Sequence, residues 1–323
     1  MATGNTNFAT LATTTLQHFA NEIFDAVTTN NPLFFHLKKS GNIKEIAGGR
    51  QFTHPVYFKQ NDTFAAISKL GTIALNLQDD ITRAVYDIKI VAGSIVLSQV
   101  EQAMNAGDKE KLIDYLEEKK MSAQITMGEV LGDQCWTATP GANDFDSIPR
   151  LINTVPSAQS DVGGIDSTAS DQTYWRNYVY ATAVTAFGTA QAGLNAMDTT
   201  LNNSTWGKQG PRIILTTKTI FTLYNLALTA NVRYSKLEDG EAGFKNLLYA
   251  TLPVMFDDNC PANRMYFIDT NSLKLQVLKQ GNMKMTAFEQ SHTQLVTSAL
   301  LHIFANITCG SRRTQAVISS ITG

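Results

Sequence analysis

Apolar and polar side chains alternate in two segments of the first third of the chain. Apart from His54, apolar residues recur at every second position from Phe52 to Phe58 and again from Tyr86 to Ile90. This period of two predicts two β-strands. About 25 residues of mixed character separate them, which is too many for a tight turn. Because a lone two-stranded hairpin is marginal in water, we expect this excursion, residues 50–100, to lie on another subunit.

The segment before the excursion, residues 1–49, is expected to be an arm without a core of its own. Phe19, Ile23 and Val27 fall on one face of a predicted helix that ends at Pro32. That apolar stripe must be buried against something, for instance a neighbouring chain.

A long helix is predicted from about Asp108 to about Cys135, a range without proline. Asp108 can cap it, and Glu110 suits the positive end of the helix dipole. About 28 residues would span roughly 42 Å, so the helix should be the backbone of residues 101–150. Its apolar stripe consists of Leu112, Leu116, Ala123, Met127, Val130 and Leu131.

Residues 138–173 are rich in Gly, Pro, Ser, Asp and Asn and predict loops at a domain crossing. The remainder predicts an α+β pattern. It consists of a helix at roughly 180–203, a strand at 212–216, a helix at 217–230, strands near 252–256, 264–269 and 273–278, and a final apolar strand at 295–310.

Composition narrows the class of protein. A hydrophobic fraction of 43% excludes a disordered chain. The net charge of -2 argues against a dedicated nucleic-acid-binding module, whereas a charged fraction of only 17% favours extensive contact between proteins. Cys135, Cys260 and Cys309 stand far apart, so buried free thiols are expected rather than disulfides or a zinc site.

No catalytic, cofactor-binding or metal-binding residues are predicted. The chain lacks the GxSxG, HExxH and P-loop motifs, and its five histidines are scattered. Its carboxylate pairs are adjacent in sequence, so they diverge and are expected on solvated faces; they are Asp79-Asp80, Glu117-Glu118 and Asp257-Asp258. We therefore expect no enzyme. A cysteine-dependent hydrolase using Cys135 or Cys260 is the remote alternative, although the helix dipole should raise the pKa of the Cys135 thiol.

Targeting and membrane segments are not expected. The first residues lack a basic region followed by an apolar one. The longest apolar stretches, 90–97 and 298–307, fall short of the roughly 20 residues that a membrane helix needs.

The stretch GGIDSTASDQTYWRN, residues 163–177, resembles a recurring pattern in major capsid proteins of tailed bacteriophages. The two glycines permit a tight turn, Trp175 offers a large anchor, and Arg176 can make a fixed bidentate contact. The cluster Ser311-Arg312-Arg313 is either a solvated tail or an electrostatic contact to a neighbour or to nucleic acid. The candidate assembly residues are Gly163, Gly164, Ile165, Asp166, Trp175, Arg176, Arg312 and Arg313. We expect Trp175 and Arg176 to lie near a symmetry axis.

The order of the parts resembles the HK97-like capsid subunit. The resemblance implies an N-terminal arm (1–49), an extended β-hairpin called the E-loop (50–100), a spine helix in the first part of the peripheral domain (101–150), a mainly axial α+β domain (151–290) and a return to the peripheral domain (291–323). Some relatives form Lys–Asn crosslinks in this loop. No activating carboxylate is evident beside Lys59 or Lys69, so we expect none here.

The resemblance implies a structural protein that self-assembles into hexamers and pentamers of an icosahedral phage head. That head would enclose double-stranded DNA with weak, non-specific contact. The expected partners are further copies of the chain, a separate scaffolding protein, portal and decoration proteins, with no membrane and no cofactor. The subunit would be assembled in the cytoplasm of the host bacterium and end in the virion. An encapsulin-like shell around a protein cargo is the alternative.

Overall fold

The computed structural model describes residues 31–73, 75–100, 109–188, 191–228, 246–290 and 294–322. Two six-stranded sheets and one separate hairpin make up its β structure. The helices are α2 (Pro32–Lys39), α4 (Lys109–Trp136), α5 (Ile148–Leu151), α6 (Ala192–Ser204) and α7 (Lys218–Ala227). None of the helices in the described ranges is long and apolar enough to cross a membrane.

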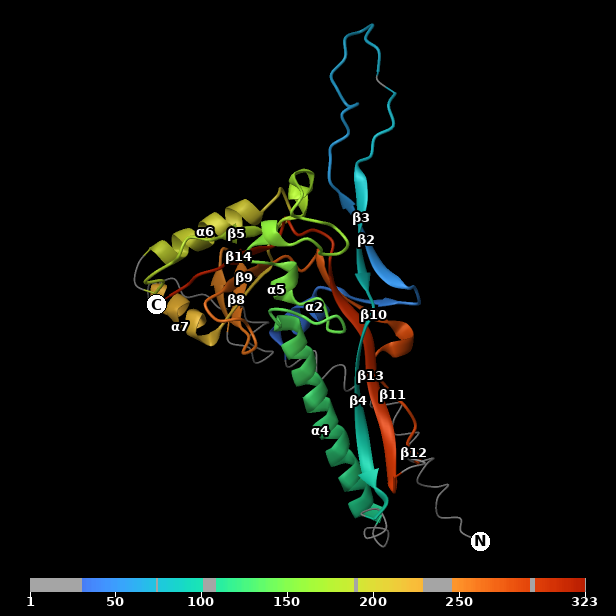
Figure 1. The fold of residues 1–323 in the computed structure, drawn as a ribbon. Helices are drawn as coiled ribbons and strands as arrows, with labels where there is room; N and C mark the ends of the chain where they lie inside the picture. Colours follow the sequence, from blue (N-terminus) through green and yellow to red (C-terminus); the bar gives the residue numbers. More distant parts are fainter. Residues whose placement is uncertain are drawn as a thin grey trace.

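The first sheet forms a long, narrow unit together with α4 (Figure 1). Its central strand is β13 (Val296–Cys309), which pairs along most of its length with β4 (Lys89–Ser98). The pairing runs antiparallel from Val296 opposite Ser98 to Ala305 opposite Lys89. The other strands of this sheet are β1 (Ile43–Ile46), β10 (Leu273–Leu278), β11 (Lys284–Met285) and β12 (Glu289–Gln290).

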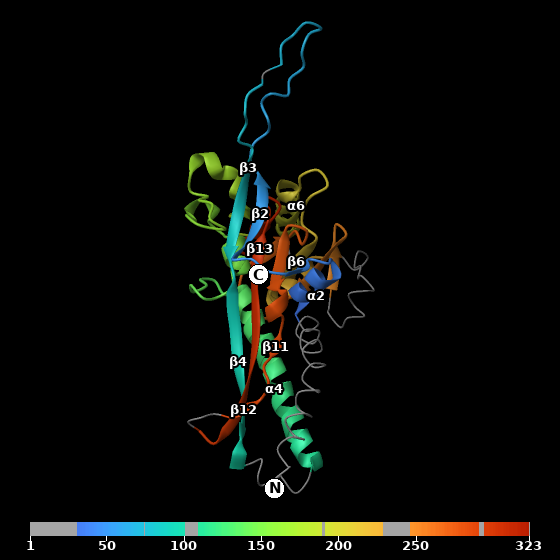
Figure 2. The ribbon, with the colours of Figure 1, turned by 90° about the vertical axis from the view of Figure 1, so that its right-hand side faces the viewer.

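The separate hairpin consists of β2 (Gln51–Tyr57) and β3 (Ile81–Asp87). Phe52, His54 and Val56 are buried while the residues between them are exposed, as the period of two predicts. The chain between the two strands extends far from the rest of the molecule (Figures 1 and 2).

The second sheet has the strand order β5 (Tyr178–Tyr180), β14 (Ala316–Ile318), β9 (Met265–Ile268), β6 (Ile213–Thr216), β8 (Leu252–Phe256) and β7 (Asn246–Tyr249). Both of its faces are covered, because alternate residues of β6 enter different cores. Ile214 packs with Met197 of α6 and Tyr224 of α7. Ile213 and Leu215 belong to the core shared with the first sheet and the end of α4.

Most sequence-predicted elements are confirmed. The predicted helix over 108–135 is α4, and the apolar segment 295–310 is β13. On the predicted stripe of α4, Met127 and Leu131 are buried, whereas Val130 is 37% exposed. The arm helix ending at Pro32 lies largely outside the described residues, as does Asp108.

Pro32 begins helix α2, where its missing N–H costs nothing, and Asn31 caps that helix. Two local predictions were wrong. The predicted helix at 180–203 starts only at Ala192, because Tyr180 belongs to β5, which pairs with β14, and Val184 pairs with Ile321. The alternation from Tyr86 to Ile90 breaks at Ile88, between β3 and β4, so that Tyr86 is buried and Ile90 is 60% exposed.

The C-terminal segment divides between the two sheets. Within residues 291–323, β13 belongs to the first sheet and β14 to the second. Strand β10, from the predicted axial segment 151–290, also lies in the first sheet. The predicted domain boundaries therefore do not coincide with the sheets, and both sheets are built from segments far apart in sequence.

Candidate assembly surfaces

The Gly163-Gly164 turn is held on the edge of the hairpin. Both glycines adopt positive φ, 65° and 72°. The Gly163 carbonyl accepts a hydrogen bond from Val85 N (2.8 Å), and Asp161 Oδ1 accepts one from Gly164 N (3.0 Å). A Cβ at position 163 would lie 3.0 Å from Tyr86 Cζ, so this position requires glycine for space as well as for conformation.

The remaining residues of the 163–177 motif make hydrogen bonds within the loop and to the residues just before it. Trp175 is buried, and its Nε1 donates to the Val162 carbonyl (2.8 Å). Arg176 Nε donates to the Ser167 carbonyl (2.7 Å). Ile165 is buried in the core, and Asp166 Oδ1 accepts from Thr168 Oγ1 (2.6 Å), which lowers the pKa of Asp166. The motif thus builds a compact loop within one subunit, and its position near a symmetry axis stays a prediction.

The burial of Arg312 contradicts both interpretations of the basic cluster. Its side chain has no exposed surface, so it is neither a solvated tail nor a contact to a neighbour or to nucleic acid. Arg312 Nε donates to the Leu151 carbonyl (2.7 Å), and Nη2 donates to Asn177 Oδ1 (3.2 Å) and to Gln159 Oε1. Burial lowers the pKa of Arg312 to about 10. This residue ties the start of the C-terminal tail to the 151–177 loops.

Arg313 is exposed instead. Its guanidinium lies over the ring of Trp206, 3.1 Å from the ring centroid. Trp206 was not predicted from the sequence, because more than a hundred residues separate it from Arg313 and it belongs to no motif.

The three thiols cannot act as nucleophiles in this fold. Cys135, Cys260 and Cys309 are all buried and unbridged. Burial raises the pKa of all three thiols, to about 12 for Cys309. A thiolate is the reactive form, so the geometry argues against the cysteine-hydrolase alternative.

The carboxylates and histidines of the described residues are the candidate ligands for a metal site. No group of three or more His, Cys, Asp or Glu in the described part could hold a metal ion. The solvated-face interpretation was wrong for Asp257, which is 5% exposed and whose pKa is raised by burial. Its neighbour Asp258 is exposed, since adjacent side chains point to opposite sides.

The tip of the excursion exposes several large apolar side chains to solvent. Its exposed apolar side chains are Phe64, Ile67, Leu70, Ile73, Leu75 and Leu77, with Leu70 and Leu75 each 94% exposed. Hydrogen bonds in the tip join near neighbours, such as Gly71 N to the Ser68 carbonyl (2.9 Å). Six large exposed apolar residues on one protruding loop are more than the single apolar residues scattered over most protein surfaces, so this loop is a candidate interaction surface.

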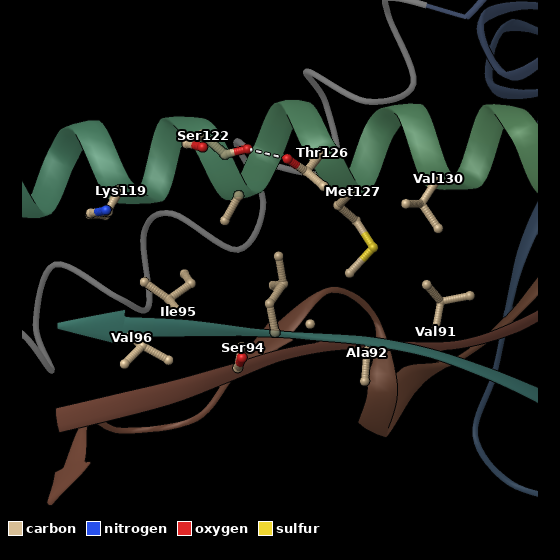
Figure 3. A pocket seen from close by; sticks show the side chains of 13 residues that line it. Val91, Ala92, Ser94, Ile95, Val96, Lys119, Ser122, Thr126, Met127 and Val130 are labelled. Carbon is tan, nitrogen blue, oxygen red and sulfur yellow. Dashed lines mark hydrogen bonds between the residues drawn. The ribbon is translucent and has the colours of Figure 1, made fainter. Parts of the chain in front are cut away.

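A second apolar surface lies in the cleft between α4 and β4, of about 350 Å³ (Figure 3). Val91 and Ile95 of β4 face Met127 and Val130 of α4 across it. Lys119 and Ser122 line its polar end. The sequence shows no sign of this cleft, because it forms only where a helix packs obliquely over a strand.

Comparison with known proteins identifies the fold. No protein-family model and no curated protein matches the sequence. A subunit of the cyanophage A-1(L) capsid is 18% identical, with a TM-score of 0.68 over 88% of this chain and 91% of that one. A subunit of the native GTA particle capsid is 11% identical, with a TM-score of 0.56 over 88% and 90% of the two chains. The SrpI encapsulin from Synechococcus elongatus is 9% identical, with a TM-score of 0.51 over 86% and 84%.

Proposed function

The chain has the α+β HK97-like capsid fold, and we propose that it is the major shell subunit of a tailed-phage head. In this proposal it assembles into hexamers and pentamers of an icosahedral shell around double-stranded DNA. The excursion is the E-loop and α4 is the spine helix. Function then rests on contacts between subunits, without catalytic residues or cofactors.

The uncovered apolar tip of the excursion is the observation that carries the proposal. Burying one fully exposed leucine contributes about 2 kcal/mol. A single subunit leaves Leu70, Leu75 and four further apolar residues in water. Contacts between many copies would bury these side chains repeatedly, which is what drives a closed shell of identical subunits.

An encapsulin-like compartment is the second candidate function, because the SrpI encapsulin shares the fold. The cyanophage A-1(L) and GTA capsid subunits have higher TM-scores than this encapsulin, which favours the phage proposal. A scaffolding protein, a portal and decoration proteins belong to the phage proposal, as does the final location in the virion.

Sedimentation velocity of the full-length chain tests the proposal. A shell subunit should show a fast-sedimenting boundary that appears cooperatively above a threshold concentration, with or without a co-expressed scaffold. Treating the particles with nuclease distinguishes the candidates: protected DNA supports a phage head, and a co-purifying protein cargo supports a compartment. A chain that sediments as a monomer under all these conditions would contradict both.

A further inference from the structure

One end of the second sheet gathers positive charge. Strands β6 and β14 both pair antiparallel with β9, with Ile213 opposite Ile268 and Ala316 opposite Phe267. The first residues of β6 and β14 therefore lie at the same end of the sheet. Arg212 directly precedes β6, and Arg313 stands three residues before β14. The hairpin turn that carries Trp206 and Lys208 also leads into β6.

The arginine of the tail is held in place by the tryptophan. The Arg313 guanidinium stacks on the Trp206 ring, which is 48% exposed. The turn that presents the ring is closed by hydrogen bonds from Trp206 N to the Gln209 carbonyl (2.7 Å) and from Gln209 N to the Trp206 carbonyl (3.0 Å). The backbone beside Arg313 is fixed by the buried Arg312. A stacked guanidinium keeps its edge free to donate hydrogen bonds.

Arg212 is oriented by an amide. In the orientation of Asn271 that satisfies both groups, its Oδ1 accepts from Arg212 Nε (2.9 Å) and Nη2 (2.7 Å). Asn271 is positioned by the bond from its backbone N to Asp269 Oδ1 (3.0 Å). Since two of the three nitrogens of the guanidinium are engaged, Nη1 remains to face a ligand.

Among the described residues, no carboxylate neutralises these positive charges. Lys208, Arg212 and Arg313 are exposed, and none forms an ion pair with a carboxylate in the described ranges. The Asp269 carboxylate lies at the same end of the sheet, but it is 2% exposed and accepts from Ser272 and Thr314. Three unpaired cations on a chain of net charge -2 form a local basic patch.

We propose that this basic patch, defined as Trp206, Lys208, Arg212 and Arg313, contacts the phosphate backbone of nucleic acid. A protein partner would need an apolar core at the contact, and the patch contains one large apolar side chain. Fixed guanidinium groups beside a lysine suit phosphate oxygens, and they carry no base specificity. Because nucleic acid inside the shell is part of the proposed function, the assignment rests on that proposal.

Binding of a short labelled DNA duplex by the unassembled full-length chain tests the patch. The variant Lys208→Gln/Arg212→Gln/Arg313→Gln removes three charges, and Lys44→Gln/Lys279→Gln/Lys284→Gln is the matched control. The control lysines are exposed on the first sheet and the turn beside it. Affinity should fall about tenfold or more in the patch variant, and the slope of log K against log salt should flatten by about 2 to 3. The control should keep most of the affinity and the slope.

Equal losses of DNA affinity in both variants, or no loss in either, would overturn the assignment of the patch to nucleic acid. Wild-type protein that binds polyglutamate as tightly as DNA would also contradict the proposal, since this result points to an acidic protein partner. Shell formation by the same variants is scored separately by electron microscopy. Normal shells with weakened DNA binding support the patch, whereas a wild-type chain that never assembles contradicts the proposed function without touching the DNA measurement.

Discussion

Alanine substitutions at Gly163 and Gly164 measure two energetic costs separately: the strain of a positive φ and the steric overlap of an added Cβ. Both residues have positive φ, but an added Cβ meets nothing within 4 Å at Gly164 and meets Tyr86 at 3.0 Å in the case of Gly163. Gly164→Ala should therefore lower the free energy of unfolding by about 1 kcal/mol through backbone strain alone. Gly163→Ala should cost at least about 2 kcal/mol, because the buried Tyr86 ring must also move. Urea unfolding of the unassembled subunit measures both, and equal costs would refute the packing argument.

Arg312 and Arg313 are adjacent in sequence but differ in energetic role. Arg312→Ala would remove the side-chain donor from the buried Leu151 carbonyl and from the half-buried Gln159 Oε1, and one of two donors from Asn177 Oδ1. We expect a loss of about 3 kcal/mol in the free energy of unfolding. The matched variant Arg313→Ala removes an exposed cation–π contact and should cost less than about 1 kcal/mol. Similar midpoints in urea for the two variants would show that the buried network contributes little.

His54 makes the stability depend on pH. Burial and the neighbouring Lys274 lower its pKa to about 4, and its Nε2 lies 2.9 Å from Thr308 Oγ1. The unfolded chain binds a proton near pH 6.5, which the folded chain takes up only near pH 4, so stability falls as the pH drops through this window. His54→Gln keeps a hydrogen-bonding side chain without this titration.

The stability difference between wild type and His54→Gln should be constant above about pH 7. As the pH falls to 4, the wild type should lose about 2 to 3 kcal/mol of unfolding free energy relative to His54→Gln. Parallel curves of unfolding free energy against pH would mean that His54 titrates normally in the folded state.

At the scale of elements, the role in assembly that we propose for the excursion can be tested separately from folding. Leu70, Leu75 and Leu77 contact little of their own subunit, so replacing all three by glutamine should change the free energy of unfolding by less than about 0.5 kcal/mol. The same change should raise the concentration needed for assembly at least about tenfold, because each leucine would lose about 2 kcal/mol of burial.

The matched control for this loop variant replaces Val155, Leu226 and Leu295, which are exposed elsewhere on the subunit, by glutamine. Light scattering during assembly compares the two variants. If both assemble like the wild type, the apolar tip is not an interface. If only the control variant fails, the interface lies elsewhere.

The sequence predicted the elements that have strong local periodicity. Strands β2, β8, β9, β10 and β13 and helix α4 match their predicted ranges within a few residues. The errors occur where tertiary pairing overrides local pattern. Tyr180 and Val184, at the predicted start of the helix over 180–203, pair instead with Ile318 and Ile321. These partners stand more than a hundred residues later, and nothing in the local sequence indicates them.

At the scale of the whole molecule, the candidate surfaces arise from pairing between distant segments. The cleft needs β4, α4 and the long pairing of β4 with β13, whose residues stand about two hundred positions apart. The basic patch likewise needs Arg313 to reach Trp206. The sequence indicated the charge of the cluster at Arg312 and Arg313 but not that the first is buried and the second exposed, because burial is decided by the whole fold.

The central claim is that this subunit is built to close a shell. Negative-stain electron microscopy of the purified full-length chain tests it most directly, at several concentrations and beside a variant that lacks residues 59–80. We predict closed shells, or rings of the size of capsomers, for the wild type, and folded but unassembled subunits for the deletion variant. Wild-type protein that stays monomeric at every concentration, or normal shells from the deletion variant, would contradict the account.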